Sequence, residues 1–240
     1  MHKPNKIVYN WLILVVLLLL VVPIALSLPT GPTVEYIRNE TKTSTQGKMI
    51  NTSGGSITTM VLNATTQNYR WKAYVGNVTG RLTLDDANDH TVFDWKLTTI
   101  VGEVYATRNP NSINWNQINC STPSNITNEE IAINHTNNPD DNISATFATK
   151  DHNTLYVGSI EIPQDSCYSI HTYVNDTNQS TNFEEILLHD KQSVVYATVI
   201  ESDELGYDPT QTFDFQLIVP EVGLPTWTSS TPYYFYVELV

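Results

Sequence analysis

The chain has 240 residues, of which 40% are hydrophobic, so it can bury a sizeable core as one large all-β domain or as two small domains. The composition is strongly acidic, with 12 Lys and Arg against 25 Asp and Glu, and neither Lys nor Arg occurs after Lys191. Binding to phosphate backbones draws its free energy from Lys and Arg that displace counterions, so nucleic acid and anionic membrane surfaces are excluded as expected partners.

The N-terminal segment predicts export. Two lysines precede an apolar run, a proline and small residues that end at Ser27, which is the order of a secretory signal peptide occupying residues 1–27. The alternative is an uncleaved hydrophobic helix over residues 7–28, which is long enough to anchor the chain in a bilayer. In both cases residues 28–240 are extracytoplasmic, at the cell surface or secreted, and touch a membrane only through this segment.

Two further features agree with export. The only two cysteines, Cys120 and Cys167, are expected to form a disulfide, which would stabilise the fold by at most about 4 kcal/mol. The N-glycosylation pattern Asn-x-Ser/Thr occurs about twice as often as chance predicts. Its candidate acceptors are Asn39, Asn51, Asn63, Asn77, Asn119, Asn125, Asn134, Asn142, Asn175 and Asn178.

Most of the chain after residue 28 alternates apolar and polar residues, which is the pattern of β-strands. Short strands separated by Gly, Asn, Asp and Pro are typical of sandwiches and barrels. We therefore expect one all-β domain over residues 28–240, an Ig-like or jelly-roll-like β-sandwich of short antiparallel strands, preceded by the N-terminal hydrophobic helix. The expected strands are 33–38, 56–62, 69–75, 78–85, 91–97, 102–107, 143–149, 154–160, 167–174, 193–200, 212–219 and 233–239.

Elements other than strands are few. A short helix is expected at 127–135, where Thr127 and Glu130 have the spacing of a capping box. The Asn-rich region near 109–142 is expected to be a variable loop system that Cys120 ties to the strand starting at Cys167.

Aromatic residues indicate where the core lies. Trp71 and Trp95 fall in alternating strands and are expected in the core. Residues 233–236 place aromatic rings on both faces of the last strand, so this strand should be buried on both sides or covered by a neighbour.

Three acidic residues, Asp85, Asp86 and Asp89, surround a candidate turn between two strands. A calcium loop of the EF-hand type needs Gly at its sixth position and Glu at its twelfth, but counting from Asp85 these positions hold His90 and Lys96. We therefore interpret this stretch as a hairpin tip, since Asp and Asn side chains bond to nearby backbone groups in turns. The three carboxylates could still bind Ca²⁺ weakly in the presence of a partner, and no other cofactor is expected.

Three stretches carry a resemblance to a known family: YRWKAYVGNVTGRLTLDDANDHTVFDW (69–95), FEEILLHDKQSVVYATVIESDELGYDPTQTFDFQLIVP (183–220) and STPYYFYVEL (230–239). Together they resemble a family of uncharacterised, exported archaeal cell-surface proteins rich in β-structure. The similarity covers the chain from about residue 56 to the end, except that 109–179 departs from the pattern. These signatures are strand-and-turn patterns, so the resemblance implies a β-rich surface protein but no activity and no functional residue.

No catalytic grouping is found in the sequence. The Gly-x-Ser-x-Gly elbow, the His-Glu-x-x-His zinc motif and paired Cys-x-x-Cys ligands are missing. Adjacent acids such as Glu184 and Glu185 point to opposite faces of a strand, so neither the pair at 184–185 nor the pair at 129–130 makes the geometry of a glycosidase by itself. The sequence therefore indicates a protein that is not an enzyme.

One residue suggests a ligand. Trp115 lies among Asn and Gln in a loop, a mixture in which an aromatic face stacks on a sugar and amides bond its hydroxyls. The competing interpretation, which we prefer, places Trp115 in the core beneath the disulfide.

The function that the sequence favours is structural. We expect a cell-surface or secreted glycoprotein that associates with itself or with other envelope proteins, as a coat or filament subunit. In the filament version, the segment from Gly31 to Lys42 would add as a strand to a neighbour's sheet. The alternative is a carbohydrate-binding or adhesion module that presents the 109–142 loops to glycans.

Overall fold

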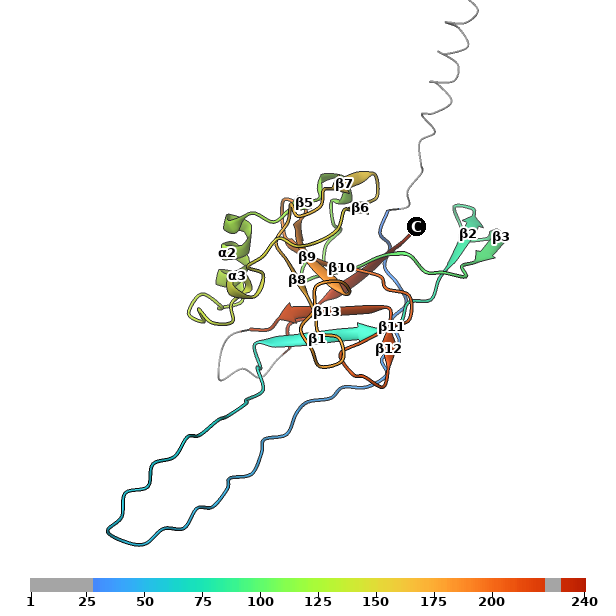
Figure 1. Ribbon diagram of the computed structural model, residues 1–240. Coiled ribbons are helices and arrows are strands. Elements are labelled where there is room, and N and C mark those ends of the chain that lie inside the picture. The colour runs from blue at the N-terminus through green and yellow to red at the C-terminus, as the bar shows by residue number, and fades with distance from the viewer. Residues whose placement is uncertain (1–27, 223–229) are drawn as a thin grey trace, which may run out of the picture.

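A computed structural model describes residues 28–222 and 230–240 and shows a mostly β protein built from antiparallel sheets (Figure 1). The all-β class is therefore confirmed. The expected N-terminal helix and the signal peptide or anchor at 1–27 lie outside the described residues. None of the helices in the described part of the chain has the length and apolar character that a membrane crossing requires.

The largest sheet has six antiparallel strands in the order β14–β4–β10–β9–β5, with β8 beside β5 on the outer edge of β9. The turn of its central β9–β10 hairpin is closed by Asp190, whose Oδ1 accepts hydrogen bonds from the backbone N–H groups of Gln192 and Ser193. The strands are β4 (Gly102–Thr107), β5 (Asn119–Cys120), β8 (Ser169–His171), β9 (Glu184–His189), β10 (Val194–Val199) and β14 (Tyr234–Leu239).

This sheet is buried on both faces. Every residue of β4 is buried, as are all but the last residues of β9 and β10. Successive side chains of a strand point to opposite faces, so Tyr105 and Ile186 belong to one hydrophobic cluster, and Ala106 and Leu187 to the other. The central strands therefore bury apolar side chains on both faces, together with a few polar ones such as Glu185, and show little of the alternation of a half-buried strand.

One face is covered by a two-stranded ribbon and two helices. The ribbon pairs β1 (Trp71–Gly76) with β13 (Phe215–Pro220), and residues of both strands pack into the cluster of Leu187. A buried carboxylate joins the two layers, since the backbone N–H of Ile218 donates to Oε2 of Glu185 in the sheet below, at 2.8 Å.

The two helices correct the expected elements. α2 (Pro123–Ala132) begins four residues before the predicted helix, because Pro123 suits the first helical turn and Thr122 forms a capping box with Asn125. α3 (Ile143–Thr146) stands where a strand was expected at 143–149. Its N-cap is Asn142, whose Oδ1 accepts from the backbone N–H of Ala145 at 2.7 Å.

The other face of the sheet is covered by the 3₁₀ helix η1 (Trp115–Gln117) and the hairpin of β6 (Leu155–Val157) and β7 (Ile160–Ile162). The expected loop region near 109–142 thus contains η1, β5 and α2, and contributes Ile113, Ile118 and Ile126 to the two clusters.

Two segments project from this body (Figure 1). The first is a hairpin of β2 (Arg81–Asp85) and β3 (Thr91–Lys96), every residue of which is exposed. The second, which we call the arm, comprises residues 31–67; it is exposed throughout and forms no strand, so the strands expected at 33–38 and 56–62 are wrong. The arm has strand-forming residues, but it pairs with no strand among the described residues, whereas β2 and β3 pair only with each other there. A fourth two-stranded sheet pairs β11 (Glu204–Leu205) with β12 (Thr212–Phe213).

The tryptophans and the last strand can now be placed. Trp71 is half-buried against the cluster of Leu187, whereas Trp95 is 50% exposed on the hairpin, so the expected core position of Trp95 is wrong. In β14, Phe235 packs against one cluster and Tyr236 against the other, as expected of a strand with aromatic rings on both faces.

Gly102 permits the pairing of β4 with β14. Its φ is 142°, and a Cβ at this position would overlap the carbonyl oxygen of Glu238 on β14. Only glycine therefore fits the start of β4.

Candidate functional site

The disulfide and Trp115 form one structural unit. Cys120 and Cys167 are bonded, with 4.9 Å between their Cα atoms. The Trp115 side chain is 9% exposed and packs between Tyr105 and Tyr236, at ring-centroid distances of 5.1 and 5.2 Å. Its ring lies in the core cluster that contains Cys167 and presents no open face on which a sugar could stack.

The three aspartates at 85–89 form the tip of the β2–β3 hairpin. Oδ1 of Asp86 accepts from the backbone N–H groups of Asn88 and His90, and Oδ2 of Asp85 accepts from the Thr83 hydroxyl. These hydrogen bonds lower the pKa of both carboxyl groups. Asp89 adopts a left-handed φ of 62° in the turn. Over the described ranges, no three His, Cys, Asp or Glu side chains gather in a way that could hold a metal ion.

The ten candidate glycosylation acceptors are accessible. Asn125, Asn134 and Asn142 are half-buried, the other seven are exposed, and none is buried. Asn125 and Asn142 also cap helices, but they do so through Oδ1, which leaves Nδ2, the atom that carries an N-linked glycan, free of that role.

A buried acid pair was missed by the sequence analysis. Glu103 on β4 lies directly opposite Glu238 on β14, and the two residues are 7% and 1% exposed. Glu238 accepts hydrogen bonds from the Tyr105 hydroxyl at 3.0 Å and from the backbone N–H of Gly158 at 2.9 Å. In the described part of the chain, Oε2 of Glu103 is buried without a hydrogen-bond partner.

Burial and the charge of Glu238 raise the pKa of Glu103 to about 8, and burial also raises the pKa of Glu238. Glu103 therefore holds a proton at neutral pH. The signal in the sequence is that both glutamates stand at positions of the strand period that are otherwise apolar, next to Tyr105 and Tyr236. Their opposition depends on the β4–β14 register, which no local pattern specifies.

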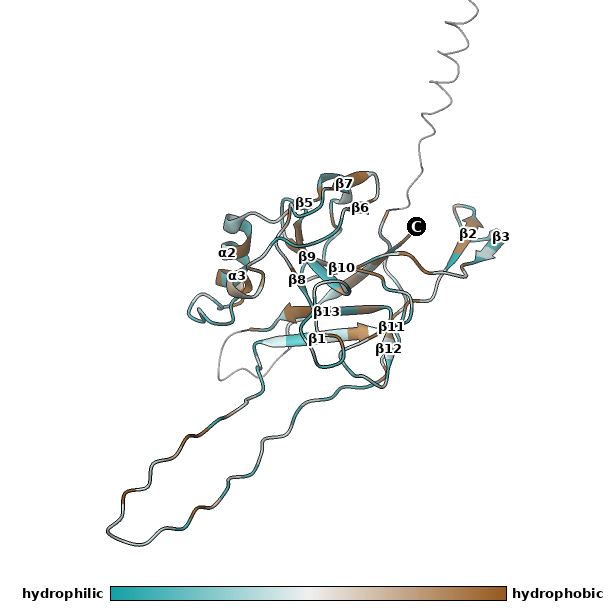
Figure 2. Cartoon of the chain, viewed as in Figure 1, coloured by the Kyte–Doolittle hydropathy of each residue, from teal (hydrophilic) through white to brown (hydrophobic). Residues whose placement is uncertain are grey.

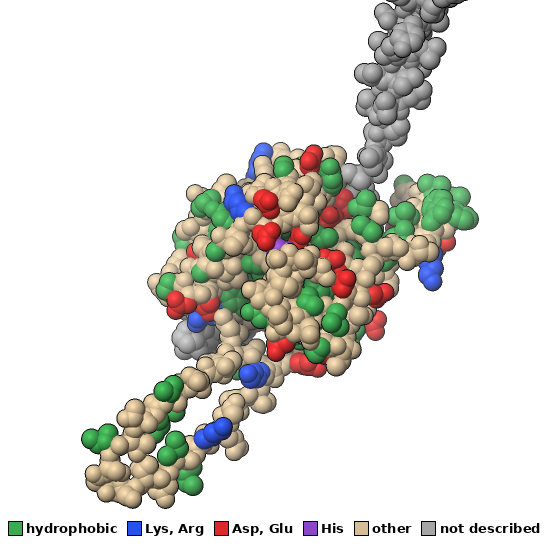
Figure 3. Space-filling view, in the orientation of Figure 1, with side chains coloured by type: hydrophobic (Ala, Val, Ile, Leu, Met, Phe, Trp, Pro, Cys, Tyr) green, Lys and Arg blue, Asp and Glu red, His purple; other side chains and the backbone are tan. Residues whose placement is uncertain are grey.

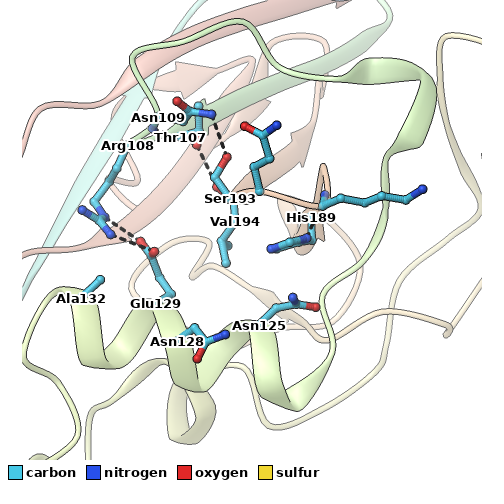
Figure 4. Close-up of a pocket in the computed structure, with 12 residues that line it drawn as sticks. Thr107, Arg108, Asn109, Asn125, Asn128, Glu129, Ala132, His189, Ser193 and Val194 are labelled. Atoms are coloured by element: carbon cyan, nitrogen blue, oxygen red, sulfur yellow. Dashed lines mark hydrogen bonds and ion pairs between the residues drawn. The ribbon is translucent and has the colours of Figure 1, made fainter.

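A polar pocket of about 430 Å³ lies between α2, the end of β4 and the β9–β10 hairpin (Figure 4). Arg108 crosses it to form a bidentate ion pair with Glu129, with Nε to Oε1 at 2.6 Å and Nη2 to Oε2 at 2.8 Å. These hydrogen bonds raise the pKa of Arg108. On the opposite wall, Nδ2 of Asn109 donates to Oγ of Ser193 at 3.1 Å.

The pocket offers donors and acceptors for hydroxyl groups. Asn128 and Gln192 add amides to its walls, and Lys191 adds an ammonium group. Burial lowers the pKa of His189, so this imidazole is neutral at pH 7, and its Nδ1 accepts from the backbone N–H of Lys191. This inventory suits a small polyhydroxylated ligand.

The projecting hairpin has one apolar face. Cross-strand neighbours share a face, so the pairs Leu82 with Trp95 and Leu84 with Phe93 lie side by side, and the two aromatic rings contact each other at 4.9 Å. Arg81 and Asp94 form an ion pair at 2.9 Å on the opposite face. Figure 3 shows apolar side chains gathered on this hairpin, away from the body.

The arm also contains large apolar residues, whose positions are coloured brown in Figure 2, and their side chains are exposed. Ile57 is 98% exposed, and the other large apolar residues of the arm are 48% to 90% exposed. They include Val34, Tyr36, Ile37, Met49, Ile50, Met60, Val61 and Leu62. In the described chain, the only side-chain hydrogen bond from the arm to the body joins Arg38 to Gln211, at 3.3 Å.

Comparisons of this chain with protein-family models, with curated proteins and with solved structures gave no match.

Proposed function

We propose that this protein is a non-enzymatic, exported cell-surface glycoprotein that acts as a coat or filament subunit of the envelope. The observation that carries the proposal is the arm. Monomeric soluble proteins rarely leave a long series of large apolar side chains in water, and such surfaces mark sites of association. The acidic, disulfide-linked body supplies a stable core from which the arm and the hairpin project.

Export and glycosylation are parts of the same proposal. Residues 1–27 serve as a signal peptide or an uncleaved anchor, and the accessible acceptor asparagines carry glycans outside the cytoplasm. The disulfide and the resemblance to exported archaeal surface proteins support this location. We take the six-stranded sheet and the β1–β13 ribbon as the two layers of a small sandwich.

The test is to isolate the native protein and measure its intact mass and sedimentation together, with and without a calcium chelator. A glycosylated chain that sediments as a polymer supports the envelope role. Loss of the polymer on chelation assigns Ca²⁺ bridging to acidic side chains such as those of the hairpin tip. A monomer without attached glycan contradicts the proposal.

A second candidate, a carbohydrate-binding module, is favoured by the polar pocket beside α2. Replacing Gln192 by Ala would then weaken glycan binding while leaving the fold intact, and a glycan array measures this. Asn125 lines the same pocket and is a candidate glycosylation acceptor, so a glycan attached there would occupy the pocket. If the native protein carries a glycan on Asn125, or if the wild type binds no glycan, this candidate fails.

A further inference from the structure

We infer that residues 56–62 of the arm add as a third strand to the outer edge of β2 in a second copy of this chain. The inference rests on the proposed association and names its donor, its acceptor and its partner.

The acceptor is incomplete as it stands. A two-stranded hairpin is marginally stable in water and usually needs a third strand or a packed layer. Within residues 28–222 and 230–240, no other strand pairs with either edge of the β2–β3 hairpin, and Leu82, Leu84, Phe93 and Trp95 remain 43% to 57% exposed. Fully burying an aromatic side chain removes roughly 150 to 250 Å² from water, so the two rings alone offer roughly 200 Å² of further burial.

The donor, residues 56–62, has the composition of a β-strand but pairs with no strand among the described residues. The segment SITTMVL at 56–62 contains four β-branched residues and no charge. Ile57 and Val61 lie on one face of an extended chain and are 98% and 85% exposed. On the edge of β2 they would extend the apolar face of the hairpin.

The beginning of the arm is less suited to this exchange, because it is already tied to its own body. Thr30 forms an antiparallel bridge with Val237 of β14, with hydrogen bonds of 2.9 and 2.8 Å. The next residue that would bond to β14 in this register is Pro32, which has no N–H to donate, so the ladder ends there. Arg38 then contacts Gln211. Residues 56–62 have no such attachment among the described residues.

Charge selects a second copy as the partner and sets the direction of the strand. The arm has three basic and two acidic residues, whereas the chain from residue 68 onward has seven basic and 23 acidic residues. A donor antiparallel to β2 places its N-terminal end at the acidic tip of the hairpin, and Lys48 precedes that end. This arrangement brings the basic part of one copy to Asp85, Asp86 and Asp89 of the next.

The arrangement is head to tail, since each copy gives an arm and receives one, and it produces open chains unless the rotation closes a ring.

A complementation experiment on the full-length protein tests it. The hairpin variant carries Phe93→Ser and Trp95→Ser, and the arm variant carries Ile57→Ser and Val61→Ser. The control is Val92→Ser, on the polar face of β3. Sedimentation velocity measures association, and circular dichroism with the intact disulfide verifies the fold.

We expect the wild type and the control to form polymers and each variant alone to associate at least about tenfold more weakly. An equal mixture of the two variants should form heterodimers, because one retains its arm and the other its hairpin. If the hairpin variant still forms polymers, the hairpin is not the acceptor, although the proposed association of the protein still holds. Two monomeric variants that form no heterodimer would overturn the arm-to-hairpin pairing. A monomeric wild type would contradict the proposed function itself.

Discussion

Glu103 of β4 and Glu238 of β14 stand directly opposite each other in the main sheet, with both carboxyl groups buried and no basic residue hydrogen-bonded to either among the described residues. Like charges in such a position repel, so the pair holds at least one proton at neutral pH.

The first prediction concerns the pH dependence of stability. The folded-state pKa of Glu103 is about 8, above its ordinary value of 4.5, so its contribution to stability is fully present below pH 4.5 and is lost as the pH rises toward 8. Replacing Glu103 by Gln should make the protein more stable than the wild type at pH 8, by about 1.4 kcal/mol for each pKa unit of the shift that is relieved. Urea unfolding at pH 4, 6 and 8 measures this effect. The control is Glu161→Gln, which replaces an exposed acid on β7. If the stabilities of the wild type and E103Q change with pH in parallel, the raised pKa of Glu103 is refuted.

Lys72 and Glu221 should show the opposite pH dependence. Burial would raise the pKa of Glu221, but hydrogen bonds from Thr231 and Lys72 outweigh it and lower the pKa below its ordinary value. The stabilisation is therefore present at neutral pH and is lost as the pH falls through the folded-state pKa. Replacing Lys72 by Met leaves the Glu221 carboxylate without its cation and should cost about 2 to 3 kcal/mol at pH 7, less than for a fully buried pair because Lys72 is partly exposed. Denaturant titration at pH 7 and pH 3 should show the loss shrinking in acid, and an equal loss at both values would count against it.

The disulfide should contribute substantially to stability. It closes a loop between positions 47 residues apart, for which chain entropy predicts about 4 kcal/mol. Replacing both Cys120 and Cys167 by Ala should lower the free energy of unfolding by that amount, together with a cost for the cavity at the fully buried Cys167. The reduced wild-type protein is the matched control, because it loses the cross-link without creating a cavity at Cys167. A reduced protein that unfolds at the same urea concentration as the oxidised one would contradict the prediction.

Trp115 and Trp95 should respond differently to truncation. Trp115→Ala removes a buried ring from between Tyr105 and Tyr236 and should cost about 3 to 5 kcal/mol. Trp95→Ala, on the exposed face of the hairpin, should cost less than about 1 kcal/mol in the dilute monomer while weakening association. Thermal unfolding at low protein concentration measures the loss of fold stability separately from the loss of association. A stable W115A protein that had lost glycan binding would restore Trp115 as a ligand residue.

The sequence predicted strands rich in β-branched and aromatic residues, such as 102–107 and 193–200, because strand propensity is a local property. It also predicted the disulfide, since two cysteines in a chain that is expected to be exported offer one intramolecular pairing. Local patterns misplaced the helix at Pro123 and missed α3, because a capping asparagine at 142 and a buried Ile143 outweighed the β-branched residues that follow.

The sequence by itself determined the acidic charge, the β class and the positions of the candidate glycosylation acceptors. Tertiary structure alone decided which strand-like segments pair, because pairing depends on an available edge and burial depends on what packs above each face. The tertiary structure therefore left residues 56–62 unpaired in water and placed Trp115 in the core. It also placed Glu103 opposite Glu238, through a strand register that joins positions 135 residues apart.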